Sequence, residues 1–129
     1  MNRNEAVIQT EIVRALRAFP DILVYDTSKL GLVFDANGRP MRLPGMTHQS
    51  DLLVIMPGSV AHAVEIKDPK FRGRKNGGLR PGQVEWRDLV WGRRFSLETY
   101  HLVYSVQDVI DALELWEEWS EVKERMGWK

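Results

Sequence analysis

The sequence predicts an α/β fold in which a mixed central β-sheet is flanked by helices, and three observations lead to this prediction. Apolar residues recur every three or four positions in residues 4–19 and again after residue 105, as in amphipathic helices. Residues 50–67 form two short apolar runs around a Pro-Gly-Ser turn, which is typical of a β-hairpin. A third helical pattern, in residues 81–92, separates two strand patterns, so helices and strands alternate along the chain.

The length and composition indicate a single domain of 129 residues (1–129), and its hydrophobic content of 43% is close to that of globular proteins. The sequence has no cysteine, which excludes disulfides and thiolate catalysis and fits a reducing compartment. Its apolar runs are far too short to cross a bilayer, and the first residues lack the apolar segment of a signal peptide. We therefore expect a soluble cytoplasmic protein with no membrane partner.

The charges are balanced overall but separated along the chain. The formal net charge is zero, which argues against a protein that binds nucleic acid by charge alone. Residues 39–94, however, contain eleven Lys and Arg against five Asp and Glu, and the C-terminal segment carries compensating glutamates. This separation predicts a surface for a polyanion on one part of the fold.

Residues 4–19 are predicted to form a helix that Asn4 caps and that ends before Pro20. Its apolar stripe consists of Ile8, Ile12, Leu16 and Phe19. Glu5 lies on the same stripe, and the residues alone leave two explanations for it. Glu5 can stabilise the positive end of the helix dipole from the first turn, or the helix can carry Glu5 into an active site.

Two further strand patterns precede the central hairpin. Residues 22–25 are predicted to form a strand. Residues 30–34 and 40–43 are predicted to form a second hairpin, because they bracket an Asn-Gly pair, which strongly favours a tight turn. Pro40 indicates that the second arm is an edge or irregular strand, because proline cannot donate a hydrogen bond to a neighbouring strand.

The central hairpin brings charged residues to one end of the sheet. Asp51 opens its first strand and Glu65 closes its second, so an antiparallel turn places both carboxylates at the same end. Side chains alternate along a strand, so Lys67 points to the same side as Glu65 and Ile66 to the other. His48, in the loop before Asp51, can bind a metal, but a single loop histidine is usually solvated.

Residues 68–80 are rich in glycine and strongly basic. The cationic positions are Lys70, Arg72, Arg74, Lys75 and Arg80. This segment can be a mobile solvated loop, or a DNA-binding arm that follows the phosphate backbone and becomes ordered on binding. Its position directly after the acidic residues favours the DNA-binding arm. It is not a P-loop, because the spacing of its glycines and lysine differs and no Ser or Thr follows.

Residues 81–92 predict a helix that opens with Pro-Gly and has Gln83, Trp86 and Val90 on one face. Gln83 lies in the first turn of that face, much as Glu5 does in the first helix. Polar residues at helix starts are usually caps, so Gln83 by itself indicates little.

A strand is predicted at residues 99–104, followed by a last helix with Ser105 and Asp108 spaced as in a capping box. The apolar stripe of this helix consists of Val106, Val109, Leu113, Trp116, Trp119, Val122, Met126 and Trp128. Such a stripe is ordinarily core, but it exceeds what a small domain needs. The surplus aromatic surface can also serve a contact between two copies of the chain.

The residues at the end of the central hairpin suit phosphodiester hydrolysis. This reaction needs a hard cation that polarises the phosphate and lowers the pKa of the attacking water. Mg²⁺ prefers oxygen ligands and keeps several waters, so Asp51, Glu65 and the Ile66 carbonyl would suffice to hold it. Lys67 can orient the water and offset the charge that develops on the phosphate.

Asp51, followed fourteen residues later by Glu-Ile-Lys (65–67), resembles the D…ExK signature of the PD-(D/E)XK superfamily of nucleases, which share a restriction-endonuclease-like fold. Two further pieces make the chain similar to the VRR-NUC family, in particular to its stand-alone, phage-type members. These are the Glu-Ala-Val-Ile-Gln stretch at 5–9 and the Pro-Gly-Gln-Val-Glu-Trp stretch at 81–86. The similarity extends over nearly the whole chain, from residue 5 to about residue 113.

The resemblance implies a catalytic site made of Glu5, Asp51, Glu65, Lys67 and Gln83. Asp51, Glu65 and the Ile66 carbonyl would be ligands of Mg²⁺ or Mn²⁺, and Lys67 would be the catalytic lysine. The implied activity is a structure-selective DNA endonuclease that resembles Holliday-junction resolvases. It would act as a homodimer on branched DNA and, if phage-encoded, in the cytoplasm of a bacterial host. The family often has Gly-x-Pro-Asp at positions where this chain has His-Gln-Ser-Asp (48–51), which affects the approach loop and leaves the ligands in place.

Two other functions stay open on the sequence. A DNA-binding module on the same fold, without cleavage, would show salt-sensitive binding and no cutting under any divalent ion. An interaction protein built around Trp116, Trp119 and Trp128 would assemble without DNA. Every residue type that a nuclease needs is present, which favours the endonuclease.

Overall fold

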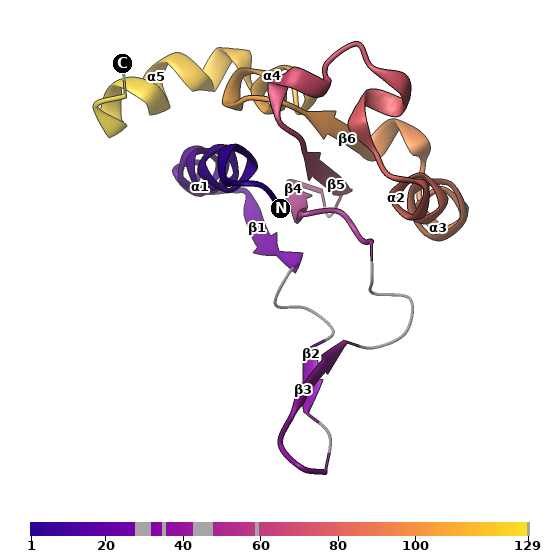
Figure 1. The fold of residues 1–129 in the computed structure, drawn as a ribbon. Coiled ribbons are helices and arrows are strands. Elements are labelled where there is room, and N and C mark those ends of the chain that lie inside the picture. Colours follow the sequence, from indigo (N-terminus) through magenta and orange to yellow (C-terminus); the bar gives the residue numbers. More distant parts are fainter. Residues whose placement is uncertain (28–31, 35, 43–47, 59, 129) are drawn as a thin grey trace.

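The structure, a computed structural model, describes residues 1–27, 32–34, 36–42, 48–58 and 60–128 (Figure 1). Its main sheet has four strands in the order β1-β4-β5-β6. These strands are β1 (Leu23–Asp26), β4 (Leu52–Met56), β5 (Val60–Ile66) and β6 (Tyr100–Val103). Both β1 and β5 pair with β4 antiparallel, whereas β6 pairs with β5 in parallel. The predicted mixed sheet is therefore confirmed.

One face of this sheet is covered by α1 (Arg3–Arg17), α4 (Val106–Ala112) and α5 (Trp116–Met126) (Figure 1). The main core lies here, where Ile12 and Ile110 from the helices pack with Val64 and Ile66 from β5. Side chains alternate along β5, so the residues between these core positions face the other way. Glu65 therefore points to the opposite face of the sheet.

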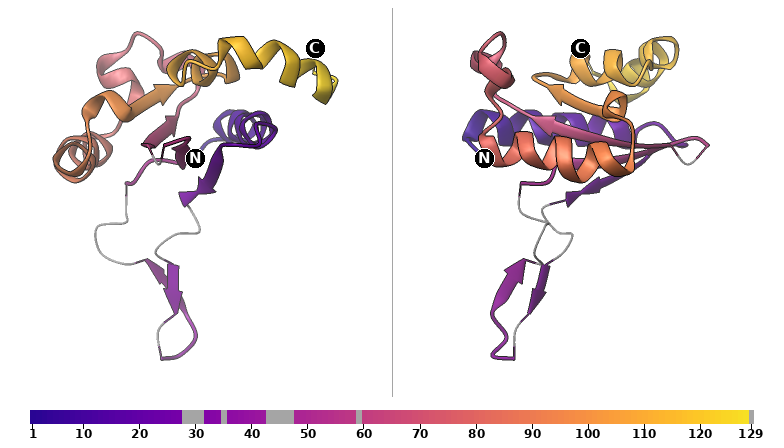
Figure 2. Two further views of the ribbon diagram at one scale, coloured as in Figure 1. Left: turned by 180° about the vertical axis from the view of Figure 1, so that it is seen from behind. Right: turned by 90° about the vertical axis from the view of Figure 1, so that its right-hand side faces the viewer.

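The segment between β5 and β6 covers that opposite face. It contains a helical rod made of α2 (Pro81–Glu85), a wider π-helical turn (Trp86–Trp91) and α3 (Gly92–Arg94), which lies across the sheet from α1 (Figure 2). Three short helical turns accompany it, at Pro69–Phe71 (η2), Lys75–Gly78 (η3) and Leu97–Thr99 (η5).

The π-helical turn corrects the predicted apolar face of the rod. An extra residue in the turn rotates the residues after it, so Trp91 is buried and Val90 is only half-buried. The Trp91 indole donates a hydrogen bond to the Thr99 hydroxyl at 3.0 Å and its ring stacks on Phe95. The regular 3.6-residue spacing assumed for residues 81–92 did not anticipate this shift.

The cap of the first helix is Asn2, and the prediction of Asn4 was wrong. The Asn2 side chain accepts from the Glu5 N–H at 2.8 Å, and the Glu5 carboxylate accepts from the Asn2 N–H at 3.0 Å, which is a reciprocal capping box. Asn4 instead donates from its side chain to Asp68 at 2.9 Å. The helix thus begins one residue earlier than expected, at Arg3.

The single last helix predicted from the C-terminal stripe is in fact two helices. Between α4 and α5 the chain passes through Glu114, whose φ of +55° belongs to the left-handed region and interrupts the helix. Ser105 caps α4 as predicted, accepting from the Asp108 N–H at 3.1 Å. The break turns Trp116 outward, with 53% of its surface exposed, while Trp119 is buried and stacks on Phe19.

A second, smaller sheet is the hairpin of β2 (Leu32–Phe34) and β3 (Pro40–Arg42), which pair antiparallel as predicted. Gly38 in its turn has a φ of +77°, which explains the Asn-Gly pair at this place. This hairpin extends away from the rest of the fold in all views (Figures 1 and 2). Residues 30, 31 and 43–47, part of the predicted strands and loop, lie outside the described residues.

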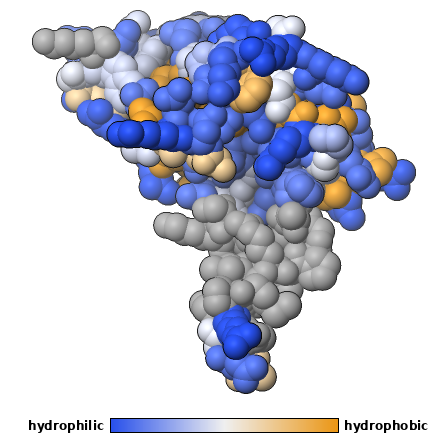
Figure 3. Space-filling model, in the orientation of Figure 1, coloured by the Kyte–Doolittle hydropathy of each residue, from blue (hydrophilic) through white to orange (hydrophobic). Residues whose placement is uncertain are grey.

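The surface in Figure 3 is mostly hydrophilic, with apolar residues in separate small patches. Among the described residues, none of the helices combines the length and the apolar character that crossing a membrane requires.

Candidate active site

The two predicted carboxylates meet at one end of the sheet. The register of β4 with β5 pairs Leu52 with Val64, so Asp51 lies directly opposite Glu65. The Asp51 carboxylate accepts a hydrogen bond from the Ile66 N–H at 2.7 Å, which ties the start of β4 to the end of β5. The hairpin therefore brings the two acids together, as its sequence predicted.

Glu65 is buried without full compensation for its charge. Only 3% of its surface is exposed. One oxygen, Oε2, receives a long hydrogen bond of 3.4 Å from the Gln83 amide, and the other, Oε1, has no hydrogen-bond partner. Burial raises the pKa of Glu65 well above its usual range, and the neighbouring charge of Asp51 raises it further. Burial raises the pKa of Asp51 as well, although the hydrogen bond from Ile66 opposes the shift.

Lys67 supplies the positive charge of this site. It follows Glu65 by two residues, is buried, and its backbone N–H donates to the Val103 carbonyl at 3.0 Å, which fixes the strand at this point. Its ammonium group lowers the pKa of both Asp51 and Glu65. No ion pair within 4.0 Å joins Lys67 to either carboxylate in the described part of the chain.

Glu5 and Gln83 reach the site from two helix starts. Glu5 is buried, completes the capping box of α1, and accepts from the Asp68 N–H at 3.3 Å, directly after Lys67. Gln83 is also buried, and its carbonyl oxygen accepts from the Arg80 N–H at 2.9 Å while its amide faces Glu65. Both side chains therefore act as caps, and both also lie next to the acidic pair.

Sequence reasoning missed the residues that hold Asp51 in place. The Thr27 N–H donates to the Asp51 carbonyl at 3.0 Å, and the Thr27 hydroxyl donates to the carbonyls of Ser50 and Asp51. The Gln49 amide donates back to the Thr27 carbonyl at 2.8 Å. These bonds depend on the pairing of β1 with β4, which no local pattern indicates. In the sequence only Gln49 and Ser50 stand beside Asp51, and no signal marks Thr27.

The cationic side chains of the basic segment contact two aromatic rings, those of Phe71 and Tyr104. Phe71 lies between Lys70 and Arg74, whose charged groups are 5.2 Å and 5.8 Å from the ring centroid. The Arg72 guanidinium lies 4.6 Å from the Tyr104 ring centroid and pairs with Asp108 at 2.7 Å. In this structure the segment is held by its own contacts, and the expectation that it orders on DNA binding stays a prediction.

Within this segment the predicted DNA-binding residues differ in their freedom to bind a phosphate. Arg72 is committed to Asp108, whereas the side chains of Lys70, Arg74 and Lys75 are exposed and have no acidic partner within 4.0 Å among the described residues. Arg80 is also exposed, at the start of α2.

The acidic pair fits a divalent cation. Two buried acids with raised pKa values and one oxygen without a partner can ionise readily when a cation binds, and Mg²⁺ prefers such oxygen ligands. Among the described residues no group of three or more His, Cys, Asp and Glu side chains is arranged to hold a metal ion. A site here would therefore use the two carboxylates with a backbone carbonyl and water, as the sequence predicts with Ile66.

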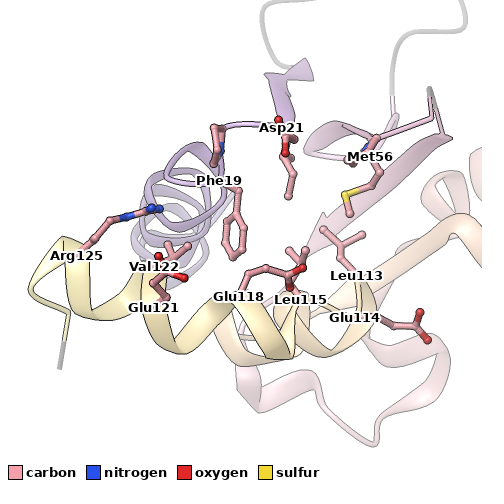
Figure 4. Close-up of a pocket in the computed structure, with 13 residues that line it drawn as sticks. Phe19, Asp21, Met56, Leu113, Glu114, Leu115, Glu118, Glu121, Val122 and Arg125 are labelled. Atoms are coloured by element: carbon pink, nitrogen blue, oxygen red, sulfur yellow. The ribbon is translucent and has the colours of Figure 1, made fainter.

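Among the described residues, one hollow beside the sheet reaches Asp51 of the acidic pair. A hollow of about 450 Å³ runs beside α1 and is lined by Gln9, Thr10, Asp26 and Asp51, among others. Another, of about 410 Å³, lies at the opposite end of the sheet, where α5 passes the ends of α1 and β4 (Figure 4). Its lining includes Phe19, Met56, Leu113, Leu115, Glu118 and Arg125 but none of the candidate catalytic residues.

The mixed sheet with helices on both sides places an acidic pair and a buried lysine at one end of an α/β fold. A solved structure described as a VRR_NUC domain is similar to this chain, with a TM-score of 0.55 and 23% sequence identity. The similarity covers 88% of this chain and 97% of that one. It confirms the predicted fold class and, at the level of the fold, the predicted resemblance to VRR-NUC proteins. Comparisons with family models and with curated proteins gave no match.

Proposed function

We propose that this protein is a metal-dependent DNA endonuclease of the VRR-NUC family. The observation that carries the proposal is the buried pair of Asp51 and Glu65, with raised pKa values and an oxygen that lacks a partner. When no cation is bound, such a pair lowers stability at neutral pH because the fold must keep a proton on a buried acid, so it is costly as a purely structural feature. Its place in a fold shared with a VRR_NUC domain supports a nuclease site.

Each residue of the acidic end has a distinct role in the proposed reaction. Asp51, Glu65 and the Ile66 carbonyl would hold Mg²⁺ or Mn²⁺, which when bound supplies the charge that polarises a phosphate and lowers the pKa of an attacking water. Lys67, on the same side of the strand as Glu65, orients the water and stabilises negative charge on the phosphate.

Glu5 and Gln83 are positioning residues in this proposal. Glu5 fixes the backbone of Asp68, directly after Lys67, and Gln83 restrains one oxygen of Glu65. Because both side chains also cap helices, their own positions are determined by the backbone. The helix starts thus limit the motion of the acidic pair and the lysine.

The proposed substrate is DNA, and branched DNA in particular. Lys70, Arg74, Lys75 and Arg80 follow the acidic end directly in sequence and present exposed cations that can bind phosphates next to the one that is cleaved. We further propose that the protein acts as a homodimer in the cytoplasm, in a bacterial host if a phage encodes it. Light scattering tests the dimer, and a strictly monomeric protein would contradict it.

A cleavage panel tests the activity. The protein is incubated with plasmid, linear duplex and four-way-junction DNA in the presence of Mg²⁺, Mn²⁺ or EDTA. We expect cleavage that needs the divalent ion, is strongest on the junction and is lost in Asp51→Ala and Glu65→Ala. Glu85→Ala, which removes an exposed acid two residues beyond Gln83 on α2, is the matched control and keeps activity.

Two outcomes would contradict the endonuclease. Activity that survives in Asp51→Ala or Glu65→Ala would place the chemistry elsewhere. DNA binding without cleavage under any divalent ion would instead support the non-catalytic DNA-binding module.

A further inference from the structure

His48 is held in an unfavourable backbone conformation beside the proposed nuclease site. Its φ is +69°, in the left-handed region that a residue with a Cβ rarely adopts and that glycine adopts freely. Backbone strain of this kind persists where the surrounding structure imposes it, and it is concentrated at functional positions. A glycine at this position would satisfy the same turn without strain, so the turn alone does not explain the histidine.

A second residue makes room for the His48 ring. A Cβ atom on Gly82 would lie 2.7 Å from both Cδ2 and Nε2 of His48, so the imidazole occupies the space that any side chain at position 82 would need. Gly82 lies in the first turn of α2, where glycine is a poorer helix former than alanine. His48 and Gly82 each carry an unfavourable backbone choice, and together they make room for the His48 imidazole.

The contact between His48 and Gly82 joins the chain segments that lead into the two carboxylates. His48 precedes Asp51 by three residues, and Gly82 directly precedes Gln83, whose amide faces Glu65. The His48 side chain is exposed, and among the described residues no hydrogen bond or ion pair engages its ring nitrogens. A ring N–H donor is thus presented to solvent from the loop that leads into Asp51.

We infer that His48 is a substrate-contacting residue of the nuclease, whose imidazole donates a hydrogen bond to a phosphate oxygen of the bound DNA strand. This inference rests on the proposed function. A phosphate is the ligand that the placement favours, because the strand cleaved at Asp51 and Glu65 must bring phosphates to this edge of the site. Removing a hydrogen bond to a charged group costs about 10- to 100-fold in binding or rate.

The test uses two substitutions that remove the imidazole from its seat in different ways. His48→Gly deletes the ring and relieves the left-handed strain, so we expect a higher Tm together with a kcat/KM for cleavage that is about 10- to 100-fold lower. Gly82→Ala keeps the ring but displaces it, and we expect a similar loss of cleavage. In the His48→Gly background, Gly82→Ala should cause no further loss, because the ring it displaces is already gone.

The matched control is Glu114→Gly, which relieves the left-handed φ of +55° in the break between α4 and α5. It should raise the Tm without changing cleavage. Full activity in His48→Gly and in Gly82→Ala would overturn the inference, and so would an equal loss from Gly82→Ala in both backgrounds.

DNA affinity, measured by fluorescence anisotropy with Ca²⁺ in place of Mg²⁺, separates the two proposals. Binding that weakens about 10-fold in His48→Gly supports the contact even if cleavage is absent and the endonuclease proposal fails. Wild-type protein that neither binds nor cleaves DNA overturns both proposals. Cleavage by the wild-type protein that His48→Gly matches overturns the His48 inference alone.

Discussion

Replacing Glu65 by glutamine should stabilise the metal-free protein while abolishing its activity. Glutamine has nearly the same shape as glutamate but no charge, and Glu65 is almost fully buried with one oxygen that lacks a partner. The folded-state pKa of Glu65 is raised above its ordinary value of 4.5. The unfolded chain therefore loses this proton more readily, and the free energy of unfolding falls as the pH rises above 4.5. At neutral pH the glutamine variant avoids this loss.

The size of the effect follows from the burial of a carboxyl group whose hydrogen bonding is incomplete. Leaving such a group without full hydrogen bonding costs about 1–3 kcal/mol. For a domain of this length, 1 kcal/mol corresponds to about 3–4 °C in Tm, so Glu65→Gln should melt about 3–12 °C higher in EDTA. The wild-type protein should gain about 2.7 kcal/mol from a divalent ion at 100 times its Kd, and the variant should gain little or nothing.

Thermal and urea unfolding, each with EDTA and with Mn²⁺, measure both effects. The matched control is Glu85→Gln, which makes the same chemical change on an exposed position of α2 and should change neither the Tm nor its response to Mn²⁺. A Glu65→Gln variant that melts below the wild-type protein in EDTA would show that the carboxylate is satisfied in the fold. An undiminished Mn²⁺ response in that variant would remove Glu65 from the metal site.

Three other predictions concern separate parts of the fold. Burial and the neighbouring charge of His62 lower the pKa of His101 to about 4. The contribution of His101 to the free energy of unfolding should therefore be constant above pH 6.5 and fall by about 1–2 kcal/mol between pH 6.5 and 4, a range reduced for partial exposure. Urea unfolding at pH 7 and 5 of Glu65→Gln, which lacks the opposing contribution of Glu65, should show this fall, and adding His101→Phe should lessen it. Gly78→Ala would place a Cβ 2.5 Å from that of Phe71 and should weaken DNA binding by disturbing the basic segment, as anisotropy would show, with an unchanged far-UV spectrum. Lys67→Met should lose cleavage yet retain Mn²⁺ binding in calorimetry, because Lys67 is not a ligand. Loss of cleavage together with loss of Mn²⁺ binding would assign Lys67 a structural role.

The sequence was most informative where one local pattern decided the structure. The central hairpin is such a case, because its turn and its alternation fix which side chains share an end and a face, and Asp51 and Glu65 lie opposite each other as expected. The mixed sheet was also predictable, because a helix between β5 and β6 allows these strands to be parallel.

The features that escaped prediction depend on contacts between distant segments or on single backbone angles. The support of Asp51 by Thr27 needs the β1–β4 pairing, and the order of the basic segment needs Tyr104, a residue far along the chain. The break at Glu114 divides one predicted helix in two, and the π-helical turn at Trp86–Trp91 adds one residue to a turn. Hydrophobic periodicity tolerates such a change, so the pattern alone cannot locate it.

Glu5 and Gln83 show why the two explanations offered by the sequence for a polar residue at a helix start are not exclusive. In each case one side-chain oxygen accepts a hydrogen bond from a backbone N–H at the helix start. This bond already restricts the side chain, so no further side-chain entropy is lost when it also serves the site. The remaining polar atom then has a defined direction: toward the Asp68 N–H for Glu5 and toward Glu65 for Gln83. Catalysis benefits from groups whose positions are fixed before the substrate arrives, and a helix cap provides such a position. The capping role therefore supports the proposed active-site role of these residues, because the same hydrogen bonds that start the helices hold the site together.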